Sequence, residues 1–280
     1  MTGKWNLIID VERCSNCNNC FLTIKDEYCD NDFPGYSRPQ PHHGHRWLDI
    51  KKRERGSGSL MDVAYLPVTC NQCDNAPCVQ KSGGAVYKRE DGIVLIDPDK
   101  ARGRQDLVAT CPYGHIWWNK ELETPQKWSL DAHLLDQGWK TPRPVTACGA
   151  FAFQAVKISD QEMGARAEAE SLEVLQPELG TRPRVWYKNL YRFTHDHLAG
   201  SVAYHLPDGR EECAEGAEVT LRQDGRVAAI ATADFFGDFK FDRLTADSSP
   251  YTLDISWRDL RLTRMVELSG SLNLGALFLS

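Results

Sequence analysis

The chain has 280 residues, of which 41% are hydrophobic and 26% are charged, and its formal net charge at pH 7 is −6. This length suits two domains, and the acidic balance argues against a surface that binds nucleic acid. No apolar run approaches the about 20 residues that a membrane-spanning helix requires, so we expect no contact with a membrane.

The first half of the chain repeats the order strand, loop and helix. Residues 5–10 predict a strand that leads into a cluster of cysteines. Two β-rich runs, 84–87 and 93–96, flank an Asp-Gly pair, which is a hairpin signal. An Asp-Pro pair then predicts a helix over about 99–109. This order is typical of half a ferredoxin, so the sequence predicts a tandem, pseudo-twofold ferredoxin-like domain.

Three further segments complete this predicted domain, which we place at residues 1–196. Residues 30–67 are a polar insertion with a basic run, expected to be a solvated loop or a contact with an acidic partner. Residues 160–176 are rich in Ala and Glu and predict a surface helix with Asp160 as its N-cap. Residues 177–196 are rich in Arg and aromatic residues and predict an extended strap across a partner.

From residue 197 the pattern changes to short runs of period-two alternation separated by turn residues. These runs are 200–206, 218–222, 227–232, 239–241, 251–257 and 262–268. Such spacing predicts a small antiparallel β-sandwich or barrel over residues 197–280. The fold class is therefore α+β.

Eight of the ten cysteines form two similar patterns. Cys14, Cys17 and Cys20 form C-x2-C-x2-C, Cys70, Cys73 and Cys78 form C-x2-C-x4-C, and Cys111 and Cys148 follow singly. Ferredoxins with two clusters bind each [4Fe–4S] cluster in this way, with three close thiolates and a fourth from another stretch of chain. A proline follows Cys111, as in bacterial ferredoxins. Cys29 and Cys213 are expected to be buried free thiols.

Zinc and disulfides are the alternatives for these cysteines. Zinc sites usually pair two C-x2-C knuckles or combine a knuckle with histidines, and a third cysteine so close is unusual for them. Disulfides need an oxidising compartment, whereas residues 1–11 lack the apolar stretch of a signal peptide. We therefore expect iron–sulfur clusters in a cytoplasmic protein. The sequence contains no nucleotide-binding loop and no hydrolase or metalloprotease motif, so no catalytic residue is expected in this chain.

Seven segments, in one order, carry a resemblance to a known family. They are Cys-Ser-Asn-Cys-Asn-Asn-Cys-Phe (14–21), Gly-His-Arg-Trp (44–47), Asn-Ala-Pro-Cys (75–78), Arg-Glu-Asp-Gly-Ile-Val-Leu-Ile-Asp-Pro (89–98), Cys-Pro-Tyr-Gly (111–114), Ala-His-Leu-Leu-Asp (132–136) and Pro-Glu-Leu-Gly-Thr-Arg-Pro-Arg-Val (177–185). The chain resembles the four-cluster iron–sulfur subunits of molybdopterin oxidoreductases of the dimethyl sulfoxide reductase type. Within them it is similar to the group of pyrogallol–phloroglucinol transhydroxylase and resorcinol hydroxylase, over essentially its whole length.

The chain departs from the family's four-motif pattern at two complete sets of ligand positions. One set would need cysteines where the chain has Ser82, Ala101, Arg104 and Leu107. The other would need them where it has Ile24, Trp128, Asp131 and Pro144. The resemblance thus implies two remaining [4Fe–4S] sites, which we call the first quartet (Cys14, Cys17, Cys20 and Cys148) and the second quartet (Cys70, Cys73, Cys78 and Cys111).

The resemblance also implies a function and a partner. The chain would be the electron-transfer subunit of a heterodimer, whose large catalytic subunit holds bis-molybdopterin guanine dinucleotide with molybdenum or tungsten. The reaction would transfer hydroxyl groups between trihydroxybenzenes or hydroxylate a dihydroxybenzene such as resorcinol, the latter with a soluble electron acceptor. The second domain resembles prealbumin-like repeats. A freestanding ferredoxin-type carrier with a β-domain tether is the alternative from the binding class, and a structural zinc protein is a third.

Overall fold

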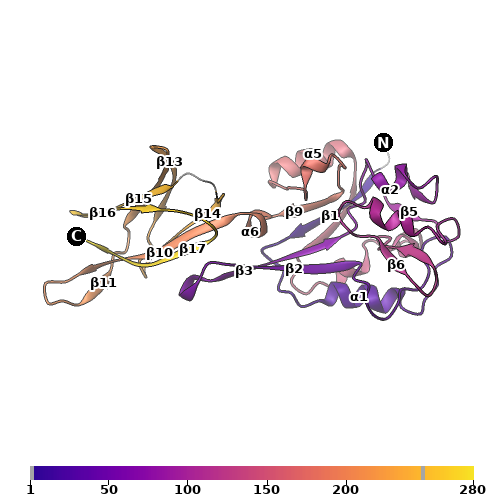
Figure 1. Cartoon of the computed structure of the whole chain (residues 1–280), viewed down its shortest axis with the longest axis horizontal. Helices are drawn as coiled ribbons and strands as arrows, with labels where there is room; N and C mark the ends of the chain where they lie inside the picture. Colours follow the sequence, from indigo (N-terminus) through magenta and orange to yellow (C-terminus); the bar gives the residue numbers. More distant parts are fainter. Residues whose placement is uncertain (1–2, 247–249) are drawn as a thin grey trace. The chain divides into compact units, whose positions relative to one another are not determined.

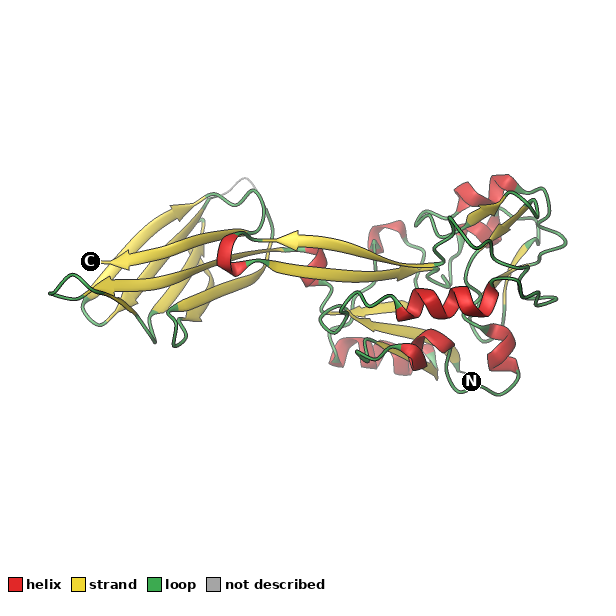
Figure 2. Ribbon diagram, turned by 90° about the horizontal axis from the view of Figure 1, so that it is seen from below, coloured by secondary structure: helices red, strands yellow, loops and turns green. Residues whose placement is uncertain are grey.

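The computed structural model describes residues 3–246 and 250–280 (Figure 1). The chain forms two compact units: the first comprises Met1–Lys51 and Tyr65–Leu190, and the second comprises Lys52–Ala64 and Tyr191–Ser280. The sequence placed the boundary a few residues later, after residue 196, and assigned the whole insertion to the first domain. The chain is mixed α and β with more strand than helix, as predicted (Figure 2).

A three-stranded sheet in the order β8-β1-β9 organises the first unit. β1 (Lys4–Asp10) confirms the strand predicted at 5–10; it pairs antiparallel with β8 (Phe153–Ile158) and parallel with β9 (Val185–Lys188). Its near-continuous apolar run is explained by this central position, because both faces are buried. On one face Ile8 packs with Met163 of α5 (Asp160–Ala169).

Short elements surround this sheet and hold the cysteine loops. The hairpin of β4 (Val86–Lys88) and β5 (Val94–Ile96) is antiparallel and confirms the predicted one. A second antiparallel hairpin joins β6 (Trp117–Asn119) and β7 (Thr124–Gln126). The remaining elements are α1 (Asn19–Tyr28), α2 (Pro77–Gln80), α3 (Ala132–Asp136), α4 (Arg143–Ala147) and the 3-10 helices η2 (Gln105–Thr110) and η3 (Pro177–Leu179).

The helix predicted over 99–109 is largely absent. Residues 98–103 form turns, and only η2 follows as a 3-10 helix. Gly103 has φ +75°, outside the helical region, and its amide donates to the carbonyl of Glu123 instead of continuing a helix. The prediction failed because this pairing with a distant residue is invisible in the local pattern.

The segments at 160–176 and 177–196 also differ from their predictions. The helix α5 ends at Ala169, before Ser171 with φ 51°. Its N-cap is Ser159, which forms a capping box with Glu162, while Asp160 pairs with Lys4 and Arg184 at 2.7 Å each. The predicted strap contains β9, a strand of the central sheet, so much of it is integral to the first unit.

The second unit consists of two four-stranded sheets that contribute to one hydrophobic core. One has the order β13-β12-β15-β16, and the other places β10 between β11 and β14, with β17 also paired to β10. Their strands are β10 (Asp196–His205), β11 (Glu211–Cys213), β12 (Glu218–Gln223), β13 (Arg226–Thr232), β14 (Asp238–Leu244), β15 (Tyr251–Trp257), β16 (Leu260–Val266) and β17 (Leu272–Leu279); the helix α6 (Tyr191–Thr194) precedes them. All six predicted runs are strands, but β11 and β17 were missed, and β10 and β17 run parallel rather than antiparallel.

The insertion at 30–67 is not simply a solvated loop. Its β2 (Leu48–Arg55) pairs with β3 (Asp62–Thr69), and the 3-10 helix η1 (Gly58–Leu60) lies between them. Within the second unit, the fully buried Arg55 side chain forms ion pairs with Asp62 and Asp242. These pairs explain why residues 52–64 belong to the second unit, because a buried guanidinium needs its carboxylates close by.

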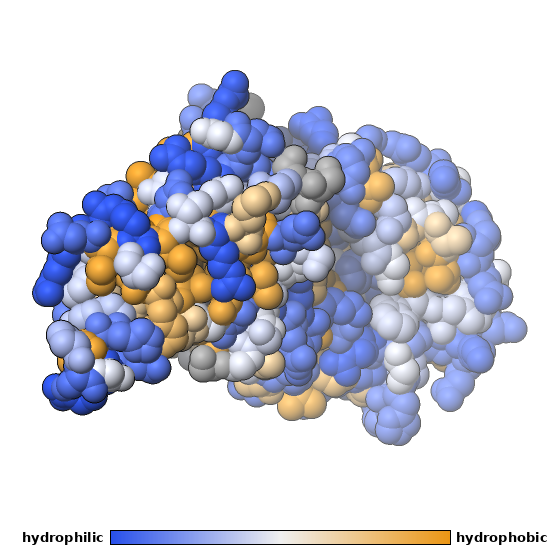
Figure 3. Space-filling model, turned by 60° about the vertical axis from the view of Figure 1, so that its left-hand side comes forward, coloured by the Kyte–Doolittle hydropathy of each residue, from blue (hydrophilic) through white to orange (hydrophobic). Residues whose placement is uncertain are grey.

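The second unit exposes several large apolar side chains. Figure 3 shows hydrophobic side chains gathered on the face of this unit that comes forward. The exposed large apolar side chains of the unit are Met61, Val227, Ile230, Phe235, Phe236 and Met265.

Candidate iron–sulfur sites

The first quartet is assembled by the end of β1, α1 and α4. After β1, the chain turns through Asn16 and Asn18, both with positive φ, which asparagine tolerates better than most residues. α1 then begins at Asn19, so Cys20 lies in its first turn. Cys148 directly follows α4, and the Asn19 side chain donates to the carbonyl of Ala147 at 3.4 Å.

These four sulfur atoms lie close enough to influence one another. Burial raises the pKa of Cys20 to about 12, and the charges of Cys14, Cys148 and Cys17 add to this rise. Burial likewise raises the pKa of Cys14, with further contributions from Cys148 and Cys17. The structure therefore brings together the four residues of the first quartet, although 128 positions separate Cys20 from Cys148.

The second quartet is built in the same way after β3. Its loop turns through Gln72, which has φ 48°, the counterpart of Asn16 in the first loop. Burial raises the pKa of Cys73 to about 12 and that of Cys78 to about 11, and the thiols of Cys70 and Cys111 add to both. Cys73, Cys78 and Cys111 also share one hydrophobic cluster.

The two single cysteines occupy equivalent local structures. Each follows a short helix, η2 before Cys111 and α4 before Cys148, and each has extended backbone. The amide four residues later donates to the sulfur: His115 N lies 3.4 Å from Cys111 Sγ, and Ala152 N lies 3.3 Å from Cys148 Sγ. Sequence reasoning missed these donors, because a backbone amide leaves no mark in the residue type. An N–H donor stabilises negative charge on the sulfur.

The chemistry of the donors fits a [4Fe–4S] cluster in each quartet. Buried thiols with raised pKa values stay protonated unless cations stabilise their thiolates, and the irons of a cluster supply that positive charge. Among the described residues, no group of three or more His, Cys, Asp or Glu side chains is close enough to hold one metal ion. In a cubane each thiolate binds a different iron, so its ligands stand farther apart than those of a single ion.

We call the two sets of positions at which the family pattern would need cysteines the vacated sets. In the set of Ser82, Ala101, Arg104 and Leu107, apolar packing and hydrogen bonds fill the space. Ala101 and Leu107 are fully buried in the same hydrophobic cluster as Cys73 and Cys78. The Ser82 hydroxyl accepts from the amide of Val86 at 3.0 Å, and Arg104 Nη1 donates to the Ser82 carbonyl at 3.1 Å. These four positions therefore lie near one another.

The other vacated set is filled by a buried polar network. Asp131 accepts hydrogen bonds from Trp128 Nε1 at 2.7 Å, Tyr28 Oη at 2.9 Å and the amide of Arg143 at 2.8 Å. Burial raises the pKa of Asp131, while these donors lower it. Ile24 is buried on α1, and Pro144 is buried on α4, which packs against it.

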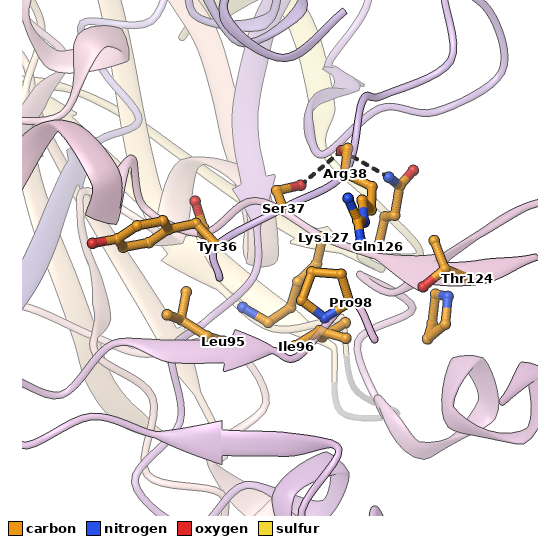
Figure 4. A pocket seen from close by; sticks show the side chains of 11 residues that line it. Tyr36, Ser37, Arg38, Leu95, Ile96, Pro98, Thr124, Gln126 and Lys127 are labelled. Carbon is orange, nitrogen blue, oxygen red and sulfur yellow. Dashed lines mark hydrogen bonds between the residues drawn. The ribbon is translucent and has the colours of Figure 1, made fainter. Parts of the chain in front are cut away.

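Cys29 and Cys213, the two cysteines outside the quartets, lie in different surroundings. Cys29 is partly buried, with Sγ 3.8 Å from the carbonyl of Pro41, and Cys213 is exposed, so the prediction that both are buried was wrong for Cys213. Figure 4 shows the side chains that line a small cavity, among them Gln126 and Arg38. The cavity has a volume of about 10 Å³, which is room for about one water, and the Gln126 side chain donates to the carbonyl of Arg38 at 2.9 Å. Across the described residues, no helix has the length and apolarity to cross a membrane.

Comparison with known proteins agrees with this geometry. Residues 61–157 match the family model of the 4Fe–4S dicluster domain. The chain is 47% identical over 255 residues to the pyrogallol hydroxytransferase small subunit of Pelobacter acidigallici, covering 90% of each protein. It is 30% identical over 192 residues to a tetrathionate reductase subunit of Salmonella typhimurium, covering 67% of this chain and 73% of the relative. It is 32% identical over 213 residues to a putative dimethyl sulfoxide reductase iron–sulfur subunit of Halobacterium salinarum, covering 66% and 79%.

The eight cysteines form two quartets, and the relatives include a small subunit and an iron–sulfur subunit of oxidoreductase-type enzymes. Together these findings identify the family. The chain belongs to the iron–sulfur subunits of molybdopterin oxidoreductases, in the group of the pyrogallol hydroxytransferase small subunit.

Proposed function

We propose that this chain is the electron-transfer subunit of a heterodimeric molybdopterin enzyme and holds two [4Fe–4S] clusters, one in each quartet. The observation that carries this proposal is the convergence of four thiols at two places, together with the filling of both vacated sites by other side chains. Eight sulfur ligands suffice for two cubanes and for no third.

The chain's own residues bind the clusters and set their environment. The thiolates of each quartet hold the irons, and the amides of His115 and Ala152 stabilise the charge on one sulfur of each set. When bound, the clusters supply one-electron redox chemistry. Substrate chemistry belongs to the partner, because no catalytic constellation was found in the sequence.

A large catalytic subunit with bis-molybdopterin guanine dinucleotide and molybdenum or tungsten is the proposed partner. Apolar exposure beside the first quartet supports a docking face there. Cys17 is exposed, Leu22 on α1 is 57% exposed, and Phe151, three residues after Cys148, is 75% exposed. Exposed apolar groups around a redox centre suit a surface that a partner covers.

The proposed substrates are phenolic compounds, and the support is the likeness to the pyrogallol hydroxytransferase small subunit. The reaction would be hydroxyl transfer between trihydroxybenzenes or hydroxylation of a dihydroxybenzene such as resorcinol, in the cytoplasm. A soluble electron acceptor is needed only for the hydroxylation. The second unit, residues 191–280 with 52–64, would be a prealbumin-like module with a structural or interfacial role.

Anaerobic purification from the native host, with whatever stays bound, tests the proposal. We expect about eight irons per chain and a stoichiometric molybdenum or tungsten on a co-purifying large subunit. Turnover that requires an added electron acceptor would identify the hydroxylase, and turnover without net oxidation would identify the transhydroxylase. About eight irons with no second chain would instead make the protein a freestanding carrier, and a zinc-containing, colourless product would refute both.

A further inference from the structure

Lys127 is a buried lysine whose ammonium, among the described residues, contacts backbone carbonyls rather than a carboxylate. The residue is only 4% exposed, and its ammonium donates to the carbonyls of Val94 and Trp128. None of the ion pairs among the described residues includes it, whereas the nearby Lys88 pairs with Asp74 at 2.9 Å. Figure 4 shows the Lys127 side chain extending toward Leu95, beside the small cavity.

Such a burial is costly unless a negative charge compensates it. Taking an ammonium group out of water is unfavourable in a protein interior when the ion is unpaired. Two carbonyl dipoles offset part of that cost and carry no net charge. A negatively charged group bound by the surrounding residues would offset the rest of the cost.

The loop of the second quartet and the Lys127 ammonium contact the same two residues, so a negatively charged cluster in this quartet would lie close to the ammonium. Gln72, in the loop between Cys70 and Cys73, accepts from the amide of Val94 at 2.8 Å and donates to the carbonyl of Trp128 at 3.4 Å. Val94 and Trp128 are the two residues that Lys127 also contacts. The cysteine loop and the ammonium are thus held by the same two backbone segments.

The electrostatic influence on the thiols agrees with this placement. Burial raises the pKa of Cys78 to about 11, and Cys70 adds to the rise, but the Lys127 charge opposes it. Burial also raises the pKa of Cys111, and Lys127 again acts in the opposite direction. For Cys14 and Cys20 of the first quartet, the influences are burial, backbone hydrogen bonds and neighbouring cysteines, with no lysine among them.

We propose that the Lys127 ammonium is the counter-charge of the cluster held by the second quartet and raises its reduction potential above that of the first cluster. A [4Fe–4S] cluster with four thiolates is net negative, and reduction adds one electron and no proton. A fixed positive charge therefore stabilises the reduced form more than the oxidised form. This inference rests on the proposed function, under which that electron is exchanged with the partner's metal centre.

The cavity beside Lys127 leaves little room for water that would screen the charge of the ammonium. Its volume of about 10 Å³ admits about one water, and Lys127 itself is buried. Charges in such surroundings interact more strongly than charges at the surface. The effect of Lys127 on the cluster should accordingly exceed that of an exposed lysine near the same quartet.

The test is a redox titration of both clusters, followed by electron paramagnetic resonance, in the complex as isolated and in its Lys127→Gln and Lys127→Met variants. At a fixed ambient potential, we expect the reduced-to-oxidised ratio of the second cluster to fall about tenfold, which is about 59 mV for a one-electron couple. The first cluster in the same molecules serves as the internal reference and should not move. Lys81→Gln is the matched control, because Lys81 is exposed three residues after Cys78.

Several outcomes would overturn the inference. They are an unchanged second cluster, an equal shift of both clusters, or a shift in Lys127→Met alone, since glutamine lacks the charge but keeps hydrogen-bond donors. If the Lys127 variants lose iron, the reduction potentials of the two clusters in the parent complex still test the proposal. The cluster with the higher potential must be the one that is missing in Cys111→Ser. If the missing cluster is instead the one with the lower potential, the proposal is refuted. Absence of iron from the parent complex would refute the proposed function instead.

Discussion

Replacing Asp131 with alanine should selectively weaken the binding of the first cluster. Asp131 connects the two helices that position the first quartet, because it accepts from Tyr28 at the end of α1 and from the amide of Arg143 at the start of α4. α1 carries Cys20, and α4 leads directly into Cys148. Loosening this connection should let the quartet open while the second quartet stays closed.

The structure sets the size of the effect. In Asp131→Ala, the Trp128 indole N–H and the Arg143 amide lose their acceptor, whereas the Tyr28 hydroxyl keeps Ser129 Oγ at 2.7 Å. Leaving both donors unsatisfied would cost about 2–6 kcal/mol if both were fully buried, and the Arg143 amide is only partly buried. Burial raises the pKa of Asp131, so the variant also avoids the cost of burying a carboxylate. We therefore expect the lower value, about 2 kcal/mol, which is about a 30-fold larger population of the open form.

The assay is the anaerobic transfer of iron from the complex to a chelator. The variant should lose half of its iron about 30-fold faster than the parent protein, while the other half leaves at the parent rate. Asp136→Ala is the matched control: Asp136 lies on the neighbouring α3, and its pairing with Arg89 at 2.6 Å is partly exposed, so its loss costs at most about 1 kcal/mol. The reasoning would be refuted if both halves of the iron left faster to the same extent. It would also be refuted if Asp136→Ala accelerated the loss of iron as much as Asp131→Ala.

Three further predictions concern the ligands and the second unit. Cys111→Ser should remove the second cluster and spare the first, so iron analysis should give about half of the parent content; equal loss of both clusters would contradict the pairing. Ser82→Cys should add no iron, because three further ligands are missing at that vacated site, and any added iron would mean that the site is misassigned. Gly237→Ala should lower the urea midpoint of the second unit more than Gly209→Ala. Both glycines have positive φ, which costs alanine about 1–2 kcal/mol, but of the two only Gly237 would place a Cβ against a neighbour, the carbonyl oxygen of Val202. Equal midpoints would show that the backbone relaxes and would contradict this expectation.

Features encoded by adjacent residues were predictable from the sequence. The strand β1, the hairpin of β4 and β5 and six strands of the second unit follow from apolar alternation and turn residues. The ligand sets could be proposed because three of the four cysteines in each quartet lie within nine residues. Assigning the fourth cysteine needed the family pattern, since nothing local links Cys20 to Cys148.

Features that depend on distant partners were not predictable in this way. The basic run at 51–55 reads as a solvated surface, yet Arg55 is buried because Asp62 and Asp242 meet it in the second unit. The helix predicted before Cys111 gives way at Gly103, whose amide bonds to Glu123. In each case a contact made only in the folded chain outweighs the local preference.

Contacts in the folded chain also explain why the two vacated sets are filled by different kinds of side chain, whereas the two quartets have the same local structure. A bound cluster demands one fixed arrangement of thiolates, which both quartets reproduce down to the amide four residues after the last cysteine. A vacated site demands only that its space be filled and its polar atoms be paired. One is filled by Ala101 and Leu107 and the other by the Trp128–Asp131 network. Placing a cluster at either set would thus require removing these packed or hydrogen-bonded side chains as well as adding four cysteines, so under the proposed function the relay of this subunit comprises two clusters.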